Sequence, residues 1–228
     1  MLQNILGQGA TFSLSPAREV ALFSAGISFN ALGYIQSRNT SILKVEDIEK
    51  LDRNDLDGLD KTTIYNYSTK ARYASDNLLV GSLFLPTILM IDPHQQNQFG
   101  EKGTMLAQTY LINAGTTLLV KSMVKRTRPF VYNENAPLSE KLKADARMSF
   151  FSGHTSFTAS SAFFTASMFT ANGQNKDLAP IIWSSAAILP AVQGYLRWKA
   201  GKHFPTDIFI GYAIGAGLGY LIPKIHEG

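Results

Sequence analysis

Six segments of this sequence are apolar and nearly free of charge, and they limit the folds that the chain can adopt. They cover residues 17–36, 76–92, 104–124, 154–171, 180–196 and 207–223. A helix needs about 20 predominantly apolar residues to cross a bilayer, with a range of about 17–25, and every segment reaches that range. We therefore predict an all-α fold, a six-helix transmembrane bundle that forms a single domain over residues 1–228.

A soluble helical bundle is the alternative interpretation of the same segments. The mean hydropathy of the chain is −0.00, and polar residues such as Asn113 and the Ser and Thr of TSFTASSAFFTASMFT interrupt the apolar runs. However, the segments are apolar around most of their circumference, and the small residues of GYAIGAGLGY suit close helix contacts in lipid. These features favour the membrane interpretation.

The longest polar stretch lies between the first two apolar segments, at residues 37–75. It holds seven basic and seven acidic residues, and LDRNDLDGLD within it has the composition of turns and helix caps. We expect short surface helices there, near the side of the bundle that carries the active site. A solvated connector is favoured over a catalytic role for its carboxylates.

Composition excludes several classes of protein. The chain has no cysteine, so it has no disulfide scaffold, thiolate zinc site or cysteine nucleophile. Its formal net charge of +4 is too mild to indicate nucleic acid as a partner. Residues 1–16 lack basic residues and a long apolar core, so they do not resemble a secretory signal peptide, and we expect any membrane-targeting signal to be internal.

Three short segments concentrate residues suited to phosphate chemistry. They are Lys121–Pro129, Phe151–His154 and Arg197–Asp207, and each lies at the boundary of an apolar segment. In a bundle whose helices alternate in direction, these boundaries all lie on the same side. We therefore expect the three segments to meet and to bring cations, histidines and a carboxylate together.

The cations in these segments match the needs of a phosphoryl group, whose charge grows in the transition state. Arg128 and Arg197 can each hold phosphate oxygens bidentately, and Lys121 supplies a point charge. Ser152 and Gly153 open the fourth helix, where free backbone N–H groups and the helix dipole favour an anion. This inventory predicts a phosphate site.

The histidines supply the reactive groups. His203 and Asp207 stand four residues apart, so the carboxylate could accept a hydrogen bond from one ring nitrogen and leave the other free to attack phosphorus. His154 then suits a general acid that protonates the leaving oxygen and later a base that activates water. His203 and Asp207 could also bind a metal, but no further cluster with ligand spacing supports that, and we expect no metal or cofactor.

The three segments together resemble the signature of the type 2 phosphatidic acid phosphatase superfamily, which is K-x6-RP, PSGH and SR-x5-H-x3-D. Six residues separate Lys121 from Arg128, which proline follows. Five residues separate Arg197 from His203, and three more separate His203 from Asp207. The second motif is present as FSGH. The resemblance extends from about the third apolar segment to the sixth and does not cover residues before about 76.

The resemblance implies a helical core and a metal-independent, two-step reaction through a phosphohistidine, often on lipid phosphates or pyrophosphates. By motif position, His203 is implied as the nucleophile, Asp207 as its partner and His154 as the general acid. The resemblance also implies a set of residues that hold the phosphoryl oxygens: Lys121, Arg128, Ser152, Gly153 and Arg197.

Two positions depart from the family pattern. Phe151 stands where the family has proline, and Leu196 stands where it has serine. Neither departure removes a proton-transfer group. Loss of the serine hydroxyl would remove one possible hydrogen bond to phosphate, typically about 0.5–1.5 kcal/mol, so we expect it to alter affinity or substrate choice.

These observations predict a membrane lipid phosphatase whose substrate is phosphatidate, phosphatidylglycerol phosphate, an isoprenyl pyrophosphate or a lipid A phosphate; the sequence does not rank them. The alternatives are a soluble or periplasmic acid phosphatase, a vanadium-dependent haloperoxidase, and a catalytically silent protein that binds a phosphorylated lipid. No feature indicates the oligomeric state.

The remaining basic residues, histidines and glycines have simpler interpretations. Four basic residues beside the motifs are expected to solvate a surface or contact lipid headgroups: Lys125, Arg126, Lys199 and Lys202. His94 and His226 have no evident partners. Four glycines of the last apolar segment are expected to serve helix packing: Gly211, Gly215, Gly217 and Gly219.

Two arguments disagree on the orientation in the membrane. Sixteen of the 21 Lys and Arg residues lie in 37–75, 125–153 and 197–206, on the expected side of the active site, and the positive-inside rule would place that side in the cytoplasm. The family resemblance implies the opposite. Because phosphate binding itself requires several of these cations, we expect a bacterial inner-membrane protein whose site faces the periplasm or exterior.

Overall fold

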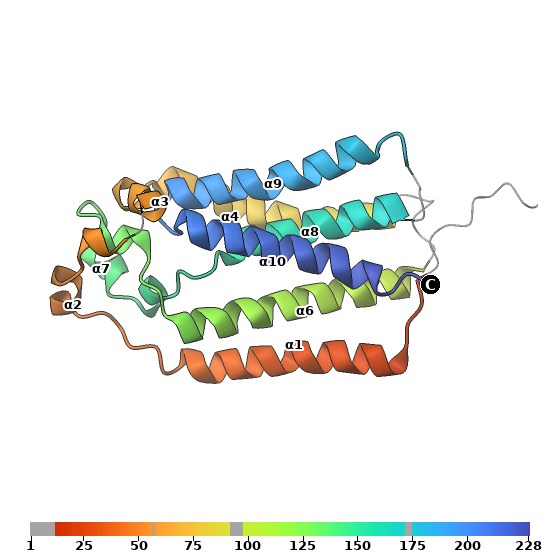
Figure 1. The fold of residues 1–228 in the computed structure, drawn as a ribbon, viewed down its shortest axis with the longest axis horizontal. Coiled ribbons are helices and arrows are strands. Elements are labelled where there is room, and N and C mark those ends of the chain that lie inside the picture. The colour runs from red at the N-terminus through yellow and green to blue at the C-terminus, as the bar shows by residue number, and fades with distance from the viewer. Residues whose placement is uncertain (1–11, 57, 92–97, 172–174) are drawn as a thin grey trace, which may run out of the picture.

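The structure is a computed structural model, and it describes residues 12–56, 58–91, 98–171 and 175–228. Within these ranges it is helical, and its β-structure consists of one isolated bridge between Phe12 and Glu227. The all-α prediction is therefore confirmed. Long helices run alternately up and down an elongated bundle (Figure 1): α1 (Pro16–Ser37), α4 (Thr69–Leu83), α6 (Phe99–Val124), α8 (Gly153–Thr170), α9 (Ala179–Lys199) and α10 (Pro205–Lys224).

Each predicted apolar segment coincides with one of these helices, but the second is interrupted. There α4 ends at Leu83, and the short helices η3 (Leu85–Thr87) and α5 (Ile88–Ile91) follow. Pro86 lies in η3, and a proline has no N–H to continue the α-helical hydrogen bonds. The count of six helices is not confirmed, because the structure also has these and other short helices.

The polar stretch and the segment after α6 form a cap of short helices at one end of the bundle (Figure 1). The short helices expected in the polar stretch at residues 37–75 are present in its described part. The short helices of the cap are α2 (Val45–Glu49), η1 (Arg53–Asp55), α3 (Gly58–Lys61), η2 (Thr62–Tyr65), η4 (Pro129–Tyr132), α7 (Leu138–Lys141) and η5 (Ala144–Arg147). Residue 12 and the C-terminus lie at the other end, where the N–H of Ser13 donates to the carbonyl of His226 at 2.9 Å.

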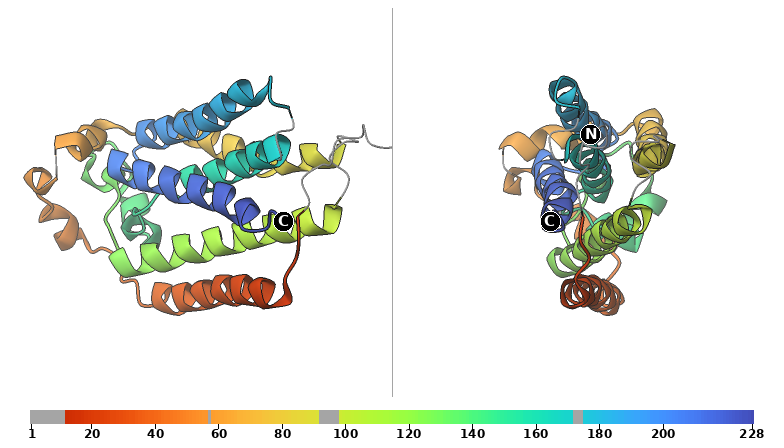
Figure 2. Two further views of the ribbon diagram at one scale, coloured as in Figure 1. Left: turned by 45° about the vertical axis from the view of Figure 1, so that its right-hand side comes forward. Right: turned by 90° about the vertical axis from the view of Figure 1, so that its right-hand side faces the viewer.

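Helix α8 lies at the centre of the bundle and packs against α4, α6, α9 and α10, whereas α1 packs along α6 at the edge (Figure 2). The buried face of α8 is rich in small polar residues that bond to neighbouring helices. Asn113 on α6 accepts from Ser156 Oγ at 2.7 Å and donates to Ser160 Oγ at 3.0 Å. Ser161 pairs with Tyr110 at 2.8 Å. These bonds satisfy polar groups that would otherwise be costly to bury.

The outer surface of the long helices is apolar. Large side chains are exposed there: Val20, Ile27 and Ile35 on α1, Ile181 and Ile188 on α9, and Phe209 and Leu221 on α10. Among the described helices, α9 and α10 are long and apolar enough to cross a membrane by length and mean hydropathy. The hydroxyl-rich composition of α8 and the charged residues near the ends of α1 and α6 lower the hydropathy of those helices.

Glycines of α10 allow it to approach α8 closely. A Cβ built on Gly215 would lie 2.0 Å from the carbonyl oxygen of Ser156, and the positions of Gly211 and Gly219 are similarly tight. The packing role expected of these three glycines is confirmed. It is wrong for Gly217, because a Cβ there would have no neighbour within 4 Å.

We predict that Gly215→Ala lowers the thermal unfolding temperature, because the methyl group forces α8 and α10 apart at a typical cost of about 1–3 kcal/mol. Gly217→Ala is the matched control two residues away. It is expected to be neutral or to stabilise by up to about 1 kcal/mol, because alanine is the better helix former. Thermal unfolding of both variants in detergent tests this, and equal unfolding temperatures would contradict the close packing.

Candidate active site

The three motif segments meet at the capped end of the bundle. Nη1 of Arg128, from the segment after α6, lies 3.1 Å from Nε2 of His203, which precedes α10. The backbone N–H of Ser152, at the start of α8, donates to the carbonyl of Asp207 on α10 at 2.9 Å. The expected convergence of separate helix ends is therefore present.

The turn that presents His203 depends on a glycine. Gly201 has φ +68°, and a Cβ there would lie 2.1 Å from the carbonyl oxygen of Asn66. Its own carbonyl accepts from the N–H of Phe130 at 2.9 Å. A side chain is disfavoured at this φ and has no room, so glycine permits the sharp connection from α9 to α10. The turn leaves His203 buried, with 1% exposure.

Asp207 is fully buried and holds the start of α10 in place. Its Oδ2 accepts from the hydroxyl of Ser149 at 2.5 Å and from the N–H of Phe204 at 2.9 Å, while Oδ1 accepts from Arg126. Nδ1 of His203 lies 3.7 Å from Oδ2, which is longer than a hydrogen bond, and has no hydrogen-bond partner among the described residues. The bond expected between imidazole and carboxylate is not formed, and Oδ2 accepts from Ser149 and from the N–H of Phe204 instead.

Arg126 differs from its predicted role as a surface cation. Its guanidinium lies between two carboxylates, at 2.6 Å from Asp60 Oδ2 and 2.5 Å from Asp207 Oδ1. Burial alone would lower its pKa, but Asp207 and Asp60 raise the pKa of Arg126 above its usual value. Asp60 is itself buried and also accepts from the hydroxyl of Thr206 at 2.7 Å. The view of the polar stretch as a solvated connector is thus wrong at Asp60, which supports the motif carboxylate.

Lys202 also differs from its predicted surface role, whereas Lys125 and Lys199 do not. Lys202 is buried, with its ammonium 3.2 Å from Glu140 Oε2 and 4.1 Å from the centre of the Phe130 ring. It therefore braces the cap against the turn before His203. Lys125 is half-buried and bonds to a backbone carbonyl, and Lys199 is exposed.

Arg128 is held in one orientation by several acceptors. Its Nε and Nη2 donate to the carbonyl and carboxylate of Asp145 at 2.9 and 2.8 Å, and its Nη1 donates to the carbonyl of Lys202 at 2.9 Å. Burial alone would raise the pKa of the Asp145 carboxyl, but Arg128 outweighs it and lowers the net value. The guanidinium is 5% exposed and faces His203 as a fixed charge.

His154 and Arg197 meet at a residue that sequence analysis missed. Oδ1 of Asp76, on α4, lies 2.8 Å from Nε2 of His154 and 3.2 Å from Nη1 of Arg197. Ser75 accepts a second bond from Arg197 at 3.0 Å. Asp76 is the first residue of the second apolar segment, and an acidic residue is costly to place in a membrane helix. That cost is the sequence signal that indicates a functional role for Asp76.

The remaining predicted phosphate contacts line the start of α8. Nζ of Lys121 donates to the carbonyls of Met148 and Ser149 at 2.7 and 3.3 Å, so in this structure it secures the loop before the FSGH turn. The hydroxyl of Ser152 caps α8. A Cβ on Gly153 would lie 3.9 Å from Cε of Lys121, so the turn passes close to the lysine side chain.

The two departures from the motif differ in their surroundings. Phe151 is fully buried and packs edge-on against Phe150, with ring centroids 6.3 Å apart. An aromatic ring thus fills the space behind the turn. Leu196 is half-buried on α9, next to Arg197.

His226, for which the sequence suggested no partner, is buried at the opposite end of the bundle. Its Nε2 lies 3.0 Å from Glu19 Oε2, and its Nδ1 lies 2.7 Å from the carbonyl of Ile222. The expectation was wrong because Glu19 is distant in sequence.

His94 lies outside the described residues. Within the described ranges, no three His, Asp or Glu residues are grouped so that they could hold a metal ion.

Burial and the nearby charges of Arg128, Lys121 and Arg197 hold the pKa of His203 well below its ordinary value of 6.5. The ring is therefore neutral, as a nucleophile requires. In the unfolded chain the same ring binds a proton below about pH 6.5, so the folded state loses stability relative to the unfolded state as the pH falls through that value.

We predict that lowering the pH from 8 to 5 decreases the free energy of unfolding of wild type more than that of His203→Gln. Glutamine does not titrate, so it lacks this contribution. Paired thermal unfolding of the two proteins across that range measures the difference. A pH-independent difference would show that the ring is not held neutral.

The fold and the site together define a class: an all-helical protein with paired histidines and buried arginines at one end of an antiparallel bundle. The chain matches the family model of the PAP2 superfamily, the type 2 phosphatidic acid phosphatases, over residues 102–228, just over half of its length. This chain belongs to the PAP2 superfamily. The matched residues include every motif residue, whereas Asp60 and Asp76 lie outside them.

Two similar proteins are both bacterial. Lipid A 4'-phosphatase of Porphyromonas gingivalis is 38% identical over 77 residues, which are 34% of this chain and 29% of that protein. The similarity thus spans less than a third of the curated relative. A transmembrane PAP2 type phosphatidylglycerolphosphate phosphatase of Bacillus subtilis, known from a crystal structure, has a TM-score of 0.48 and 16% identity, with 88% of this chain and 95% of that chain covered.

Proposed function

We propose that this chain is a membrane lipid phosphatase that hydrolyses a phosphate monoester or pyrophosphate through a phosphohistidine. The single observation that carries the proposal is the 3.1 Å approach of His203 Nε2 to Arg128 Nη1 inside a buried cationic site. A neutral imidazole beside a fixed guanidinium is suited to attack a phosphorus atom whose oxygens that guanidinium holds. Membership of the PAP2 superfamily supports the same chemistry.

The first half-reaction transfers the phosphoryl group to the protein. Nε2 of His203 forms a bond to phosphorus as the bond to the leaving oxygen breaks. Arg128 and Arg197 neutralise the charge that grows on the other phosphoryl oxygens, and Lys121 joins them by leaving the carbonyls it now contacts. His154 donates a proton to the leaving oxygen.

The second half-reaction releases phosphate. His154, now neutral, takes a proton from water, whose oxygen attacks phosphorus as the bond to His203 breaks. Asp207 and its partner Arg126 keep the start of α10, and so the His203 ring, in place throughout. The chain's own residues supply every group in this scheme.

A lipid substrate fits the surroundings of the site. The site lies at one end of a bundle whose long helices expose large apolar side chains, and we propose that this end lies at the level of the lipid headgroups. A groove of about 730 Å³ between α9 and α10 is lined mainly by apolar side chains, among them Trp198 and Phe209. Pro205 and Thr206, which lie between His203 and Asp207 in sequence, also line it. We propose that the groove holds an acyl or isoprenyl chain of the substrate.

A panel of substrates in EDTA tests the proposed function. Phosphatidate, phosphatidylglycerol phosphate, an isoprenyl pyrophosphate and a lipid A phosphate are compared with glycerol 3-phosphate, which lacks the lipid chains. We expect phosphate release from at least one lipid at a kcat/KM well above that for glycerol 3-phosphate. Failure on all lipids, or activity that requires an added metal ion, would overturn the proposal.

We further propose that the protein is integral to a bacterial inner membrane, with the site facing the periplasm or exterior. The site and the C-terminus lie at opposite ends of the bundle (Figure 1), so the proposal puts the C-terminus in the cytoplasm. A C-terminal fusion to a reporter that is active only in the cytoplasm should be active. Activity of a periplasm-specific reporter at the same position would reverse the orientation.

A further inference from the structure

The carboxylate of Asp76 contacts both His154 and Arg197, two of the predicted site residues. A single oxygen, Oδ1, contacts both Nε2 of His154 at 2.8 Å and Nη1 of Arg197 at 3.2 Å. The three side chains come from α4, α8 and α9, so this contact depends on three helices that are separate in sequence. Asp76 also lies outside the residues that match the family.

The contact fixes which nitrogen of His154 is available for chemistry. A carboxylate beside Nε2 favours the tautomer that carries its proton there, because the N–H can donate to the oxygen. Nδ1 forms no hydrogen bond to any other described residue, so it is the nitrogen left to exchange a proton with a ligand. Ser152 caps α8 just before His154, which limits movement of its backbone.

We propose that Asp76 is a positioning residue for phosphoryl transfer, which binds Nε2 of His154 so that Nδ1 donates and accepts the catalytic proton. This inference rests on the proposed function. In the first half-reaction, the proton on Nδ1 passes to the leaving oxygen as the phosphorus–oxygen bond breaks. In the second, Nδ1 takes a proton from the attacking water, and the proton on Nε2 stays with the Asp76 contact throughout.

The surrounding charges explain why a carboxylate is needed. His154 shares Oδ1 of Asp76 with the guanidinium of Arg197. The positive charge of Arg197 disfavours the imidazolium that must protonate the leaving group. The negative charge of Asp76, whose Oδ1 lies 2.8 Å from Nε2 of His154, opposes it. The same oxygen also holds Arg197 in place.

Leaving-group dependence distinguishes this role from a structural one. An alkoxide leaving group needs the proton from His154, whereas p-nitrophenolate leaves readily without it. The test compares Asp76→Asn with wild type on dioctanoyl phosphatidate and on p-nitrophenyl phosphate. It uses kcat/KM, which reports only the steps up to loss of the leaving group. We expect a loss of about 100-fold on the lipid and less than about 5-fold on the aryl ester.

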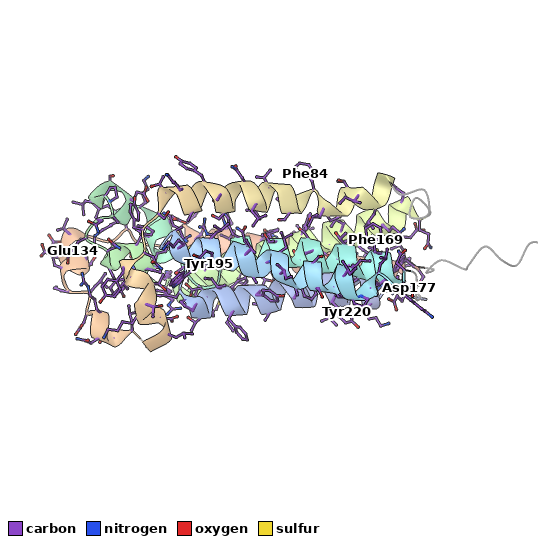
Figure 3. The ribbon with its side chains drawn as sticks, turned by 90° about the horizontal axis from the view of Figure 1, so that it is seen from above. Phe84, Glu134, Phe169, Asp177, Tyr195 and Tyr220 are labelled. Carbon is purple, nitrogen blue, oxygen red and sulfur yellow. The ribbon has the colours of Figure 1, made fainter. Side chains whose placement is uncertain are left out.

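The pH profile gives a second reading. Without the carboxylate, the protonated form of His154 is less stable. The alkaline limb of the pH profile of kcat/KM on the lipid should therefore move to lower pH. Asp76→Glu, which keeps the charge, should restore part of the lipid activity. Asp177→Asn is the matched control, because Asp177 is exposed at the end of the bundle opposite Glu134 and the cap (Figure 3). It should behave as wild type.

Equal losses of Asp76→Asn on the two substrates, or no loss on the lipid, would overturn the role of Asp76. Thermal unfolding of each variant shows whether a loss on both substrates reflects misfolding, and Asp76→Glu then provides the comparison in a folded protein. These outcomes differ from failure of the proposed function, in which wild type itself would release no phosphate from any lipid.

Discussion

His203→Gln is expected to abolish phosphate release, with a fall in kcat on the order of 10⁴-fold or more, the scale seen when an enzyme loses its nucleophile. Glutamine has no nitrogen that can attack phosphorus, and the neighbouring Arg128 cannot replace it. Phosphate release from the best lipid of the panel measures the fall. Brief incubation of wild type with ³²P-labelled substrate, followed by a quench in base, should trap an acid-labile phosphoprotein that the variant lacks.

His226→Gln is the matched control for this experiment. His226 is also buried, but it lies at the opposite end of the bundle and contacts Glu19 rather than the site. We expect it to lower stability while leaving the activity per folded molecule close to that of wild type. A His203→Gln protein that keeps a tenth or more of the activity would contradict the assignment of the nucleophile.

Arg128→Lys is expected to lower kcat/KM by about 10²–10³-fold, comparable to the loss of one preorganised donor for transition-state charge. Lysine keeps the charge but cannot donate in a plane to Asp145, to the carbonyl of Lys202 and toward His203 at once. Most of the loss should appear in kcat rather than in KM. The reason is that the guanidinium is placed to stabilise the phosphoryl oxygens while Nε2 of His203 attacks phosphorus. Steady-state kinetics on the lipid substrate measures both parameters.

Arg38→Lys controls for the exchange itself. Arg38 is exposed just after α1, near the same end of the bundle, and its side chain forms no ion pair with another residue in the described ranges. The variant should retain full activity. If Arg128→Lys kept more than about a third of the wild-type kcat/KM, a point charge would suffice at this position. The planar hydrogen bonding of the guanidinium would then not be needed for activity.

Local sequence was sufficient to predict the long helices and the residues of the motifs. The apolar segments coincide with the long helices because burial and helix length depend on composition over a continuous stretch. The motif spacing placed Arg128, His203 and Asp207 near one another, since each lies next to a helix end and alternating helices bring those ends together. The break after Leu83 was not predicted, although Pro86 marks it.

Tertiary structure alone determined which charges pair. In the sequence, Asp60 lies in a polar loop and Asp76 at the boundary of an apolar segment. In the structure, Asp60 pairs with Arg126 and Asp76 with Arg197, each more than 60 residues away in sequence. The sequence does not encode such contacts in its periodicity, because an ion pair depends on where helices end in space and on how deeply its members are buried. Arg126, expected to be a surface cation, is for the same reason a partly buried link between two buried carboxylates. What the chain by itself determined is therefore its long helices and its motif residues, and what packing decided is which partners hold those residues and how deeply they are buried.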